Sequence, residues 1–236
     1  MKVIPAIDLW DGKVVRLLKG NPDLSTIYSD DPIEVANKWK DQGADLLHLV
    51  DLSAALGQKD NVGVIEKILK EVDIKVEIGG GIRDIEKVEK LISLGAERVI
   101  IGTKGMDENF LKKVIKSVSS SKLAVSVDVV DSYLAVKGWK EKTTFKTFDF
   151  IEFLRNNGVK WIIYTDISRD GTLDGIDFTK INELSVYNDL NIIVSGGVSS
   201  IDDIKEIKEK TPFVWGVITG KAIYEDKLSL LEAFKI

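Results

Sequence analysis

An α/β barrel, in which eight parallel strands each lead into a helix, is the fold that this sequence predicts. Eight short apolar runs alternate with amphipathic helical patterns along the 236 residues. No stretch rich in Pro, Gly or Ser divides the chain into separate parts. Sequence landmarks also recur about 115 to 120 residues apart, which indicates an internal duplication. A single (β/α)8 domain fits this length, because such barrels start at about 200 residues.

The strands are predicted from runs of three to six residues that are rich in Val and Ile and do not alternate with polar residues. Strands that are covered on both faces of a parallel sheet have this composition. The predicted strands are Val3–Ile7, Leu46–Val50, Ile74–Ile78, Arg98–Ile101, Leu123–Val127, Trp161–Tyr164, Ile192–Val194 and Val214–Ile218.

Helices are predicted between these runs from their start and stop signals. Asp31, followed by a proline, is a typical N-cap, and Gly43 ends that helix. A second helix runs from Asp84 to Gly95, and Ser200 precedes another with the pattern of a capping box. Further helices are expected to start near Val62, Asp107, Thr147, Asp177 and Asp226. This alternation predicts a parallel sheet, either a closed barrel or an open doubly wound sheet.

The internal repeat favours the closed barrel. The landmark pairs are Asp8 and Asp128, Asp51 and Asp166, Gly79–Gly81 and Ser195–Gly197, and Gly102–Lys104 and Gly220–Ala222. Each pair follows strands that are four apart in the predicted order, so we expect two half-barrels, at about residues 1–120 and 121–236. An open sheet would not readily produce this twofold equivalence.

Composition excludes several kinds of chemistry. The chain has no Cys and one His, His48, so it lacks thiolate nucleophiles, disulfides and multi-His metal centres. Acid–base chemistry therefore falls mainly to Asp and Glu. The net charge of −5 argues against nucleic-acid binding, and no apolar run reaches the length of a membrane span. With no recognisable signal peptide, a cytoplasmic location is expected.

Two glycine-rich clusters follow predicted strands, where active sites of barrels lie. One comprises Gly79–Arg83 with Gly102 and Thr103, and the other comprises Ser195–Val198 with Thr219–Lys221. Backbone N–H groups at such turns bind phosphate, so the two clusters predict a small-molecule substrate with a phosphate at each end. The alternative interpretation is that these glycines allow close packing of strands and helices.

Three carboxylates are candidates for acid–base catalysis. Asp8 and Asp128 occupy equivalent strand ends, which suits proton removal on one side of a substrate and donation on the other. Asp170 lies in the loop after the sixth strand. The alternative roles are structural, since an Asp at a strand end caps the next loop and an Asp before Gly forms turns.

Two further side chains have open assignments. His48 lies within the second strand, where it is either a packed, hydrogen-bonded residue or part of the site. Trp139 lies in a long polar segment, where it either closes over a planar ring or anchors the loop. The stretch from Asp11 to Ser29 is expected to be a long loop and a candidate lid.

An ordered set of motifs resembles a known enzyme family, the phosphoribosylformimino-5-aminoimidazole carboxamide ribotide isomerases of histidine biosynthesis. The resemblance runs from Val3 to about Tyr224. The matching segments are Ala6–Leu9, Gly12–Leu17, Leu49–Ser53, Gly79–Arg83, Val125–Asp128 and Lys137–Trp139. The cyclase subunit of imidazole glycerol phosphate synthase is similar, but it typically begins with a Cys-Leu-Asp-Val type motif and has His where this chain has Arg83.

The resemblance implies an Amadori rearrangement of an aminoaldose bisphosphate into an aminoketose, with no metal and no cofactor. The twofold repeat within one chain makes a monomer sufficient, and no obligate protein partner is expected. The resemblance also implies that Asp8 is the base and leaves the acid role to Asp128 or Asp170, with Thr165 positioning the substrate. The predicted binding residues are Arg16, Gly20, His48, Gly80, Gly81, Arg83, Gly102, Thr103, Trp139, Gly171, Ser195, Gly196, Gly197, Gly220 and Lys221. The alternatives are the cyclase, an isomerase with side activity on phosphoribosyl anthranilate, and a non-catalytic phosphate-binding barrel.

Overall fold

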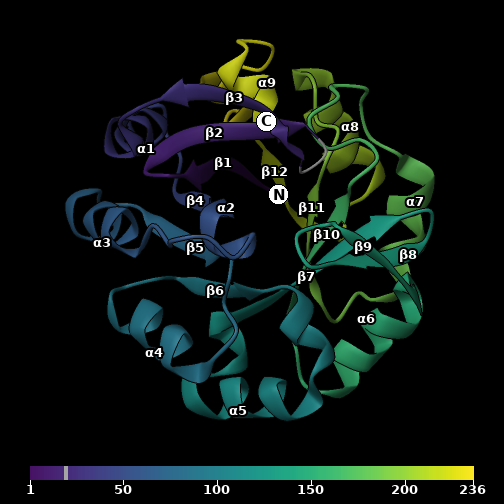
Figure 1. The fold of residues 1–236 in the computed structure, drawn as a ribbon. Coiled ribbons are helices and arrows are strands. Elements are labelled where there is room, and N and C mark those ends of the chain that lie inside the picture. Colours follow the sequence, from purple (N-terminus) through teal and green to yellow (C-terminus); the bar gives the residue numbers. More distant parts are fainter. Residues whose placement is uncertain (19–20) are drawn as a thin grey trace.

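Eight parallel strands close into a barrel in a computed structural model that describes residues 1–18 and 21–236 (Figure 1). The barrel strands are β1 (Lys2–Trp10), β4 (Leu46–Asp51), β5 (Lys75–Gly79), β6 (Arg98–Ile101), β7 (Leu123–Val130), β10 (Trp161–Asp166), β11 (Asn191–Ser195) and β12 (Val214–Thr219). Each pairs in parallel with its neighbours, and the pairings of β10 with β7 and of β12 with β1 complete the ring. The predicted (β/α)8 barrel is confirmed, and the open sheet is wrong.

Helices surround the strands (Figure 1). They are α1 (Pro32–Asp41), α2 (Leu52–Ala55), α3 (Val62–Glu71), α4 (Ile85–Ser93), α5 (Glu108–Val118), α6 (Thr147–Asn156), α7 (Phe178–Glu183), α8 (Ile201–Lys210), α9 (Lys221–Tyr224) and α10 (Leu230–Ala233). Short 3-10 turns occupy Thr103–Met106, Ser120–Lys122 and Leu184–Val186. In the described part of the chain, no helix has the length and apolar character needed to cross a bilayer.

The predicted helix signals act as caps in the structure. The Asp31 carboxylate accepts hydrogen bonds from the backbone N–H groups of Ile33 and Glu34. Ser200 and Asp203 form a complete capping box at the start of α8. The last helix begins at Leu230 rather than near Asp226.

Two antiparallel hairpins extend the barrel where long loops were expected. The stretch after Trp10 forms β2 (Lys13–Leu18) and β3 (Asn21–Ser29), and the segment after Val130 forms β8 (Tyr133–Val136) and β9 (Glu141–Lys146). The expectation of a loop from Asp11 to Ser29 is therefore wrong.

The cause is a two-residue turn at the end of each barrel strand. Asp11 and Gly12 connect β1 to β2, and Asp131 and Ser132 connect β7 to β8. All four residues have positive φ, as tight hairpin turns of the primed type require. The two hairpins follow β1 and β7, the first and fifth barrel strands, which supports the half-barrel interpretation. That division of the chain stays a prediction.

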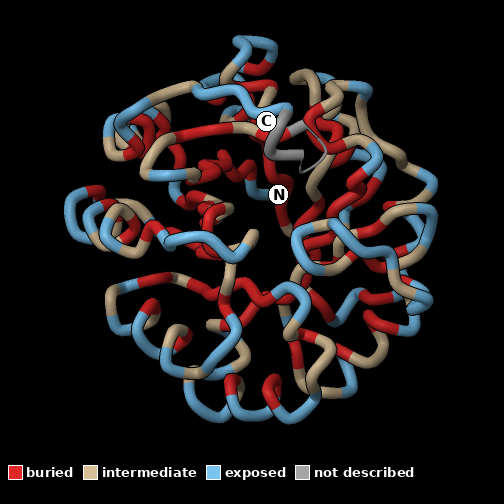
Figure 2. Tube along the Cα trace, viewed as in Figure 1, coloured by how far each residue is buried: buried red, intermediate tan, exposed pale blue. Residues whose placement is uncertain are grey.

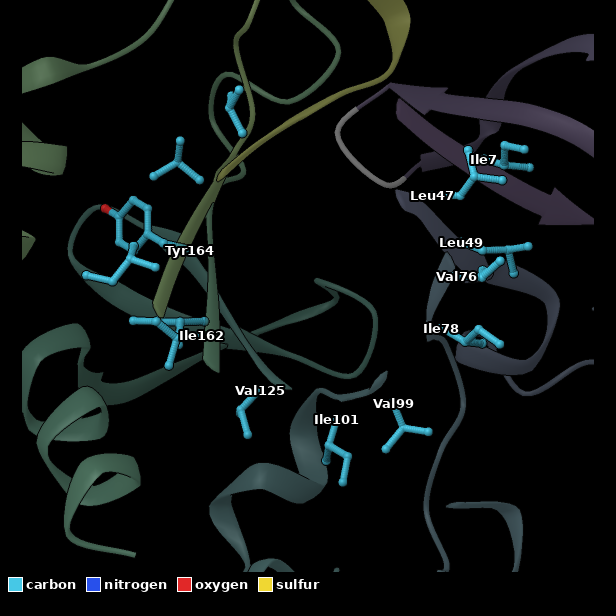
Figure 3. Close-up of a cluster of buried hydrophobic side chains, with 14 of the residues drawn as sticks. Ile7, Leu47, Leu49, Val76, Ile78, Val99, Ile101, Val125, Ile162 and Tyr164 are labelled. Carbon is cyan, nitrogen blue, oxygen red and sulfur yellow. The ribbon is translucent and has the colours of Figure 1, made fainter. Parts of the chain in front are cut away.

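Apolar side chains cover both faces of the barrel wall. The interior cluster comprises Ile4, Ala6, Leu46, Ile100, Ala124, Ile163, Ile193 and Ile218. A much larger cluster lies between strands and helices, and Figure 3 shows part of it, including Ile7, Leu47 and Val125. Buried positions accordingly follow the strands and the inner helix faces, with exposed positions around the rim (Figure 2). Burial on both faces explains why the strands are apolar without alternation.

We predict that Leu47→Ala lowers the free energy of unfolding by about 2–5 kcal/mol, because Leu47 is fully buried and truncation leaves a cavity. Leu231→Ala is the matched control, since its side chain is 53% exposed. Chemical denaturation of both variants measures the difference. Equal losses in the two variants would contradict the described core.

Candidate active site

Arg16 joins two of the predicted catalytic carboxylates at the C-terminal mouth of the barrel. From strand β2, its Nη1 donates to Asp8 Oδ2 and its Nη2 donates to Asp170 Oδ2, both over 2.8 Å. Asp8 lies near the end of β1 and Asp170 lies on the loop after β10, 154 positions beyond Arg16, so residues far apart in the sequence meet at one guanidinium. All three side chains are largely buried.

Burial and charge act against each other in this group. Burial would lower the pKa of the Arg16 guanidinium, but the charges of Asp170 and Asp8 raise it, and the net pKa lies above its usual range. Burial also raises the pKa of Asp170, and the nearby charges of Asp8 and Asp128 add to this rise while Arg16 opposes it. Asp8 and Asp128 are therefore both close enough to affect the pKa of Asp170.

Asp128 occupies the matching position on β7. Its side chain is enclosed, and burial raises its pKa above that of an ordinary Asp. Ser126 donates to its Oδ1 over 2.6 Å, and interactions with Trp139 and Thr165 also oppose the rise in pKa. Thr165 lies directly beside Asp128 in the register of β10 with β7. The structure thus brings Asp128, Thr165 and Trp139 together.

A hollow beside Arg16 contains the second glycine-rich cluster. Its lining includes Arg16, Asp170, Gly171, Ser195, Gly196, Gly197, Thr219, Gly220 and Lys221. The Lys221 ammonium group donates to the carbonyl of Gly171 over 2.9 Å, which ties α9 to the loop of Asp170. A cation, two glycine turns and the start of α9 surround this hollow, an arrangement suited to a phosphate.

Close packing accounts for part of the glycine pattern. A Cβ on Gly80 would lie 2.2 Å from the Asp51 carbonyl oxygen, and one on Gly196 would lie 2.5 Å from the Asp166 carbonyl oxygen. Both glycines also have φ above +90°. The alternative interpretation of these residues as packing glycines is therefore supported at equivalent places in the two halves.

The glycines of the two clusters also have backbone N–H groups that are available to a ligand. Within residues 1–18 and 21–236, the backbone N–H groups of Gly80, Gly81, Gly196 and Gly197 donate to no protein acceptor. At the mouth of the barrel such groups are donors for an anion. The phosphate role of both clusters stays a prediction.

The first cluster is covered by the second hairpin. The backbone N–H of Lys137 donates to Thr103 Oγ1 over 2.9 Å, and a Cβ on Gly138 would meet the Leu56 side chain at 3.0 Å. Arg83 is exposed, and its Nη2 donates to the carbonyl of Ala55. A Cβ on Gly102 would meet nothing within 4 Å. The predicted binding residue Gly20 lies outside the described residues.

The first hairpin is anchored on α9. The rings of Tyr28 and Tyr224 stack with centroids 4.6 Å apart, and the Tyr28 hydroxyl donates to Glu225. The Tyr224 hydroxyl donates to the Ala6 carbonyl, two residues before Asp8 on β1. These contacts join α9 to β1 and to β3, the strand that pairs with the Arg16-bearing strand β2.

His48 lies inside the barrel and has a buried acidic partner that sequence reasoning missed. Its Nδ1 lies 2.8 Å from Glu77 Oε1, and Arg98 donates to the other oxygen of Glu77. The signal was present, because Glu77 and Arg98 interrupt otherwise apolar strands. The hydrogen-bonded interpretation of His48 is therefore supported.

The described residues contain no group of three or more His, Cys, Asp or Glu side chains arranged to hold a metal ion. At the mouth, Arg16 is paired with Asp8 and Asp170, whereas among the described residues Arg16 Nε and Thr219 Oγ1 are buried without a hydrogen-bond partner.

Comparison with known proteins places the whole barrel in one family. Residues 2–229 match the family described as "Histidine biosynthesis protein". This chain belongs to that family. The match covers both hairpins and every barrel strand, as the sequence resemblance implied.

Individual relatives carry a more specific name, 1-(5-phosphoribosyl)-5-((5-phosphoribosylamino)methylideneamino) imidazole-4-carboxamide isomerase. The chain is 44% identical to the protein of this name from Nitrosopumilus maritimus, over 99% of this chain and 98% of the relative. It is also 44% identical to the protein of this name from Lactococcus lactis subsp. lactis, over 100% of this chain and 99% of the relative. The identity to the protein from Pelagibacter ubique is 42%, over 100% of this chain and 98% of the relative.

We predict that Gly80→Ala lowers the free energy of unfolding by about 2 kcal/mol or more, because a side chain would meet the Asp51 carbonyl in a strained conformation. Gly63→Ala, in the open first turn of α3, should be neutral or raise stability by up to about 1 kcal/mol. Urea denaturation checks both. Unchanged stability in Gly80→Ala would remove the packing requirement and leave ligand binding as the reason for the glycine.

A second prediction concerns pH. Because folding raises the pKa of Asp128, its ionised form destabilises the folded chain. The free energy of unfolding of the wild type therefore falls as the pH rises from about 4, the ordinary pKa of Asp, through the higher pKa of Asp128 in the folded chain. Asp128→Asn should therefore be more stable than wild type at pH 7, and the gap should close toward pH 4. Urea denaturation from pH 4 to pH 8 measures it, and a gap independent of pH would contradict the assignment.

Proposed function

We propose that this chain is an isomerase of histidine biosynthesis that converts the bisphosphorylated aminoaldose into its aminoketose. The observation that carries the proposal is the meeting of Asp8 and Asp170 at Arg16, with Asp128 near Asp170 and a glycine-lined hollow beside them, in a chain whose relatives are named for this isomerisation. The names of these relatives also favour the isomerase over the cyclase.

The reaction is an intramolecular transfer of hydrogen and needs an acid and a base. An acid protonates the ring oxygen of the ribose, so that the ring opens and C1 becomes part of a Schiff base. A base then removes the proton from C2, which gives an enolamine. Protonation at C1 and loss of the hydroxyl proton at C2 give the ketone, so no atoms or electrons are gained or lost. Proton transfer of this kind suits positioned carboxylates.

The environments of the carboxylates support different roles for them, as acid and as base. Burial raises the pKa of Asp128 and of Asp170, which favours a carboxyl group that still carries a proton to donate. Asp8 accepts from the Arg16 cation and is assigned the role of base. Asp128 and Asp170 both remain candidates for the acid, and Thr165, beside Asp128, positions the substrate.

The phosphates are assigned to the two ends of the mouth. The hollow of Gly196, Gly197, Gly220 and Lys221 takes one, and the turn of Gly80, Gly81, Gly102 and Thr103 takes the other. Arg16, Arg83 and Trp139 contact the remainder of the substrate. Gly171, Ser195 and His48 complete the proposed binding set.

The same proposal includes a monomer that acts in the cytoplasm without an obligate protein partner, on a small molecule and on neither nucleic acid nor membrane. Each barrel half supplies one hairpin and one glycine turn, so one chain contains both ends of the proposed site. Light scattering of the purified chain and cell fractionation test these two points.

We predict that Asp8→Asn lowers kcat for the aminoaldose by about 10²- to 10⁴-fold, since the amide cannot accept the C2 proton. Spectroscopic assay of the isomerisation measures kcat, and calorimetric titration with the product checks that binding persists. Asp202→Asn is the matched control, because this carboxylate is 77% exposed on α8. Retained turnover in Asp8→Asn would remove Asp8 from the role of base.

Parallel assays separate the alternatives. Ammonia-dependent formation of imidazole glycerol phosphate by the pure chain would indicate the cyclase. Turnover of phosphoribosyl anthranilate would indicate a second isomerase activity. Binding of the bisphosphate with no conversion in the wild type would indicate a phosphate-binding barrel without catalysis.

A further inference from the structure

A chain of buried polar side chains runs through the barrel interior below the mouth. His48 on β4, Glu77 on β5 and Arg98 on β6 come from three neighbouring strands. Arg98 Nε and Nη2 donate to Glu77 Oε2 over 3.1 and 2.7 Å, and Glu77 Oε1 lies 2.8 Å from His48 Nδ1. The Glu77 side chain is 0% exposed. The proposed catalytic steps do not use Glu77 or Arg98.

Arg98 is held in place by two indole rings. Its guanidinium carbon lies 3.9 Å from the ring centroid of Trp161 and 5.3 Å from that of Trp215. The two rings contact each other edge to face with centroids 4.7 Å apart. A planar cation on aromatic faces, with two of its nitrogens donating to one carboxylate oxygen, has little freedom to rotate. Arg98 therefore holds Glu77 in place, and the second oxygen of Glu77 is presented to His48.

This arrangement determines which nitrogen of His48 carries a proton. Burial would raise the pKa of Glu77, but its contacts with His48 and Arg98 lower it below the usual range, so the carboxylate is ionised and only accepts hydrogen bonds. Nδ1 must then be the donor. The second nitrogen, Nε2, points away from Glu77 because the two nitrogens lie on opposite sides of the ring.

His48 lies within reach of the catalytic group. Its Cα is paired with that of Ala6, one side-chain layer below Asp8 on the same strand pair. His48 is also among the groups whose electrostatic interaction affects the pKa of Asp128, so the two side chains lie near each other. Among the described residues, the charged groups that interact with the imidazole are Glu77 from β5 and Asp128 from β7, and Arg98 from β6 holds Glu77.

We propose that Glu77, braced by Arg98, is a positioning residue that holds His48 with its proton on Nδ1 and its Nε2 toward the acid–base group of the mouth. Glu77 touches no substrate in this arrangement and acts through the imidazole. The kinetic consequence rests on the proposed isomerase function, whereas the protonation state of His48 does not.

The chain itself supplies a direct probe, because His48 is its only histidine. Labelling with ¹⁵N-histidine gives one imidazole in the NMR spectrum of the full chain. We expect a protonated Nδ1 and an unprotonated Nε2 near neutral pH, with a slowly exchanging imidazole proton. In Glu77→Gln the negative charge is lost, and we expect faster exchange and a mixture of the two tautomers. Glu66→Gln, on the exposed face of α3, is the matched control and should leave the spectrum unchanged.

Kinetics then test whether the geometry matters for the reaction. Glu77→Gln should lower kcat about ten- to a hundredfold with little change in KM, as expected for a misplaced group near the reacting atoms. His48→Asn should cause a similar loss. Adding Glu77→Gln to His48→Asn should cost little more, because Glu77 acts only through His48.

Stability is controlled with a paired variant. If Glu77→Gln unfolds because Arg98 is left without a partner, Glu77→Gln with Arg98→Met removes both charges, and the same NMR and kinetic comparison is made on it. Thermal unfolding confirms that each variant compared is folded.

Two results would overturn the proposal. One is an Nε2-protonated imidazole in the wild type, or a spectrum that Glu77→Gln leaves unaltered. The other is additive loss of kcat in the double variant, which would give Glu77 a role independent of His48. A wild type that isomerises no aminoaldose contradicts the proposed function instead, and the NMR arm still decides the assignment of Glu77.

Discussion

The guanidinium of Arg16 sits between two buried carboxylates that the barrel brings together from the first and second halves of the chain. Buried carboxylates in a group repel one another and lose the hydration of their charges, so at least one cation or proton must accompany them. Arg16 supplies the cation, and the raised pKa of Asp170 shows that this compensation is partial. The hairpin, the loop after β10 and the end of β1 are all arranged around this contact.

The glycines around the mouth are required by close backbone packing. Each half of the barrel turns sharply after its third strand and passes within van der Waals contact of a neighbouring carbonyl, so a side chain is excluded at Gly80 and at Gly196. The turn that packing requires also leaves backbone N–H groups directed to no protein acceptor. Packing and anion binding are therefore not competing explanations for these residues, because one backbone conformation serves both.

The fold could be predicted from the sequence because burial on both faces leaves a strong signal. Runs such as Leu123–Val127 have one explanation in a chain of this length, and caps such as Asp31 and Ser200 mark the helices between them. The hairpins were not predicted, because Asp11-Gly12 and Asp131-Ser132 follow barrel strands, after which a loop and a helix were expected. A two-residue turn with positive φ signals a hairpin, and Asp-Gly is the commoner form of that signal.

The candidate site was predictable only in part. Strand ends locate Asp8 and Asp128, since parallel strands present their last residues at one mouth. Glu77 and Arg98 were visible in the sequence as charges on otherwise apolar strands. Their contacts with each other and with His48 could not be predicted, because these depend on which interior side chains meet across neighbouring strands. The pairing of Arg16 with Asp170 was equally hidden, as it spans 154 residues and a loop whose shape the sequence does not specify.

The stacked rings of Tyr28 and Tyr224 have a mechanical consequence. Tyr224 ends α9, the helix whose first residue is Lys221, and Tyr28 belongs to the hairpin that carries Arg16. Helix α9 therefore borders the anion hollow at its first residue and packs on the hairpin at its last. Four residues of one short helix thus join the wall of the hollow to the hairpin whose guanidinium pairs with the two carboxylates.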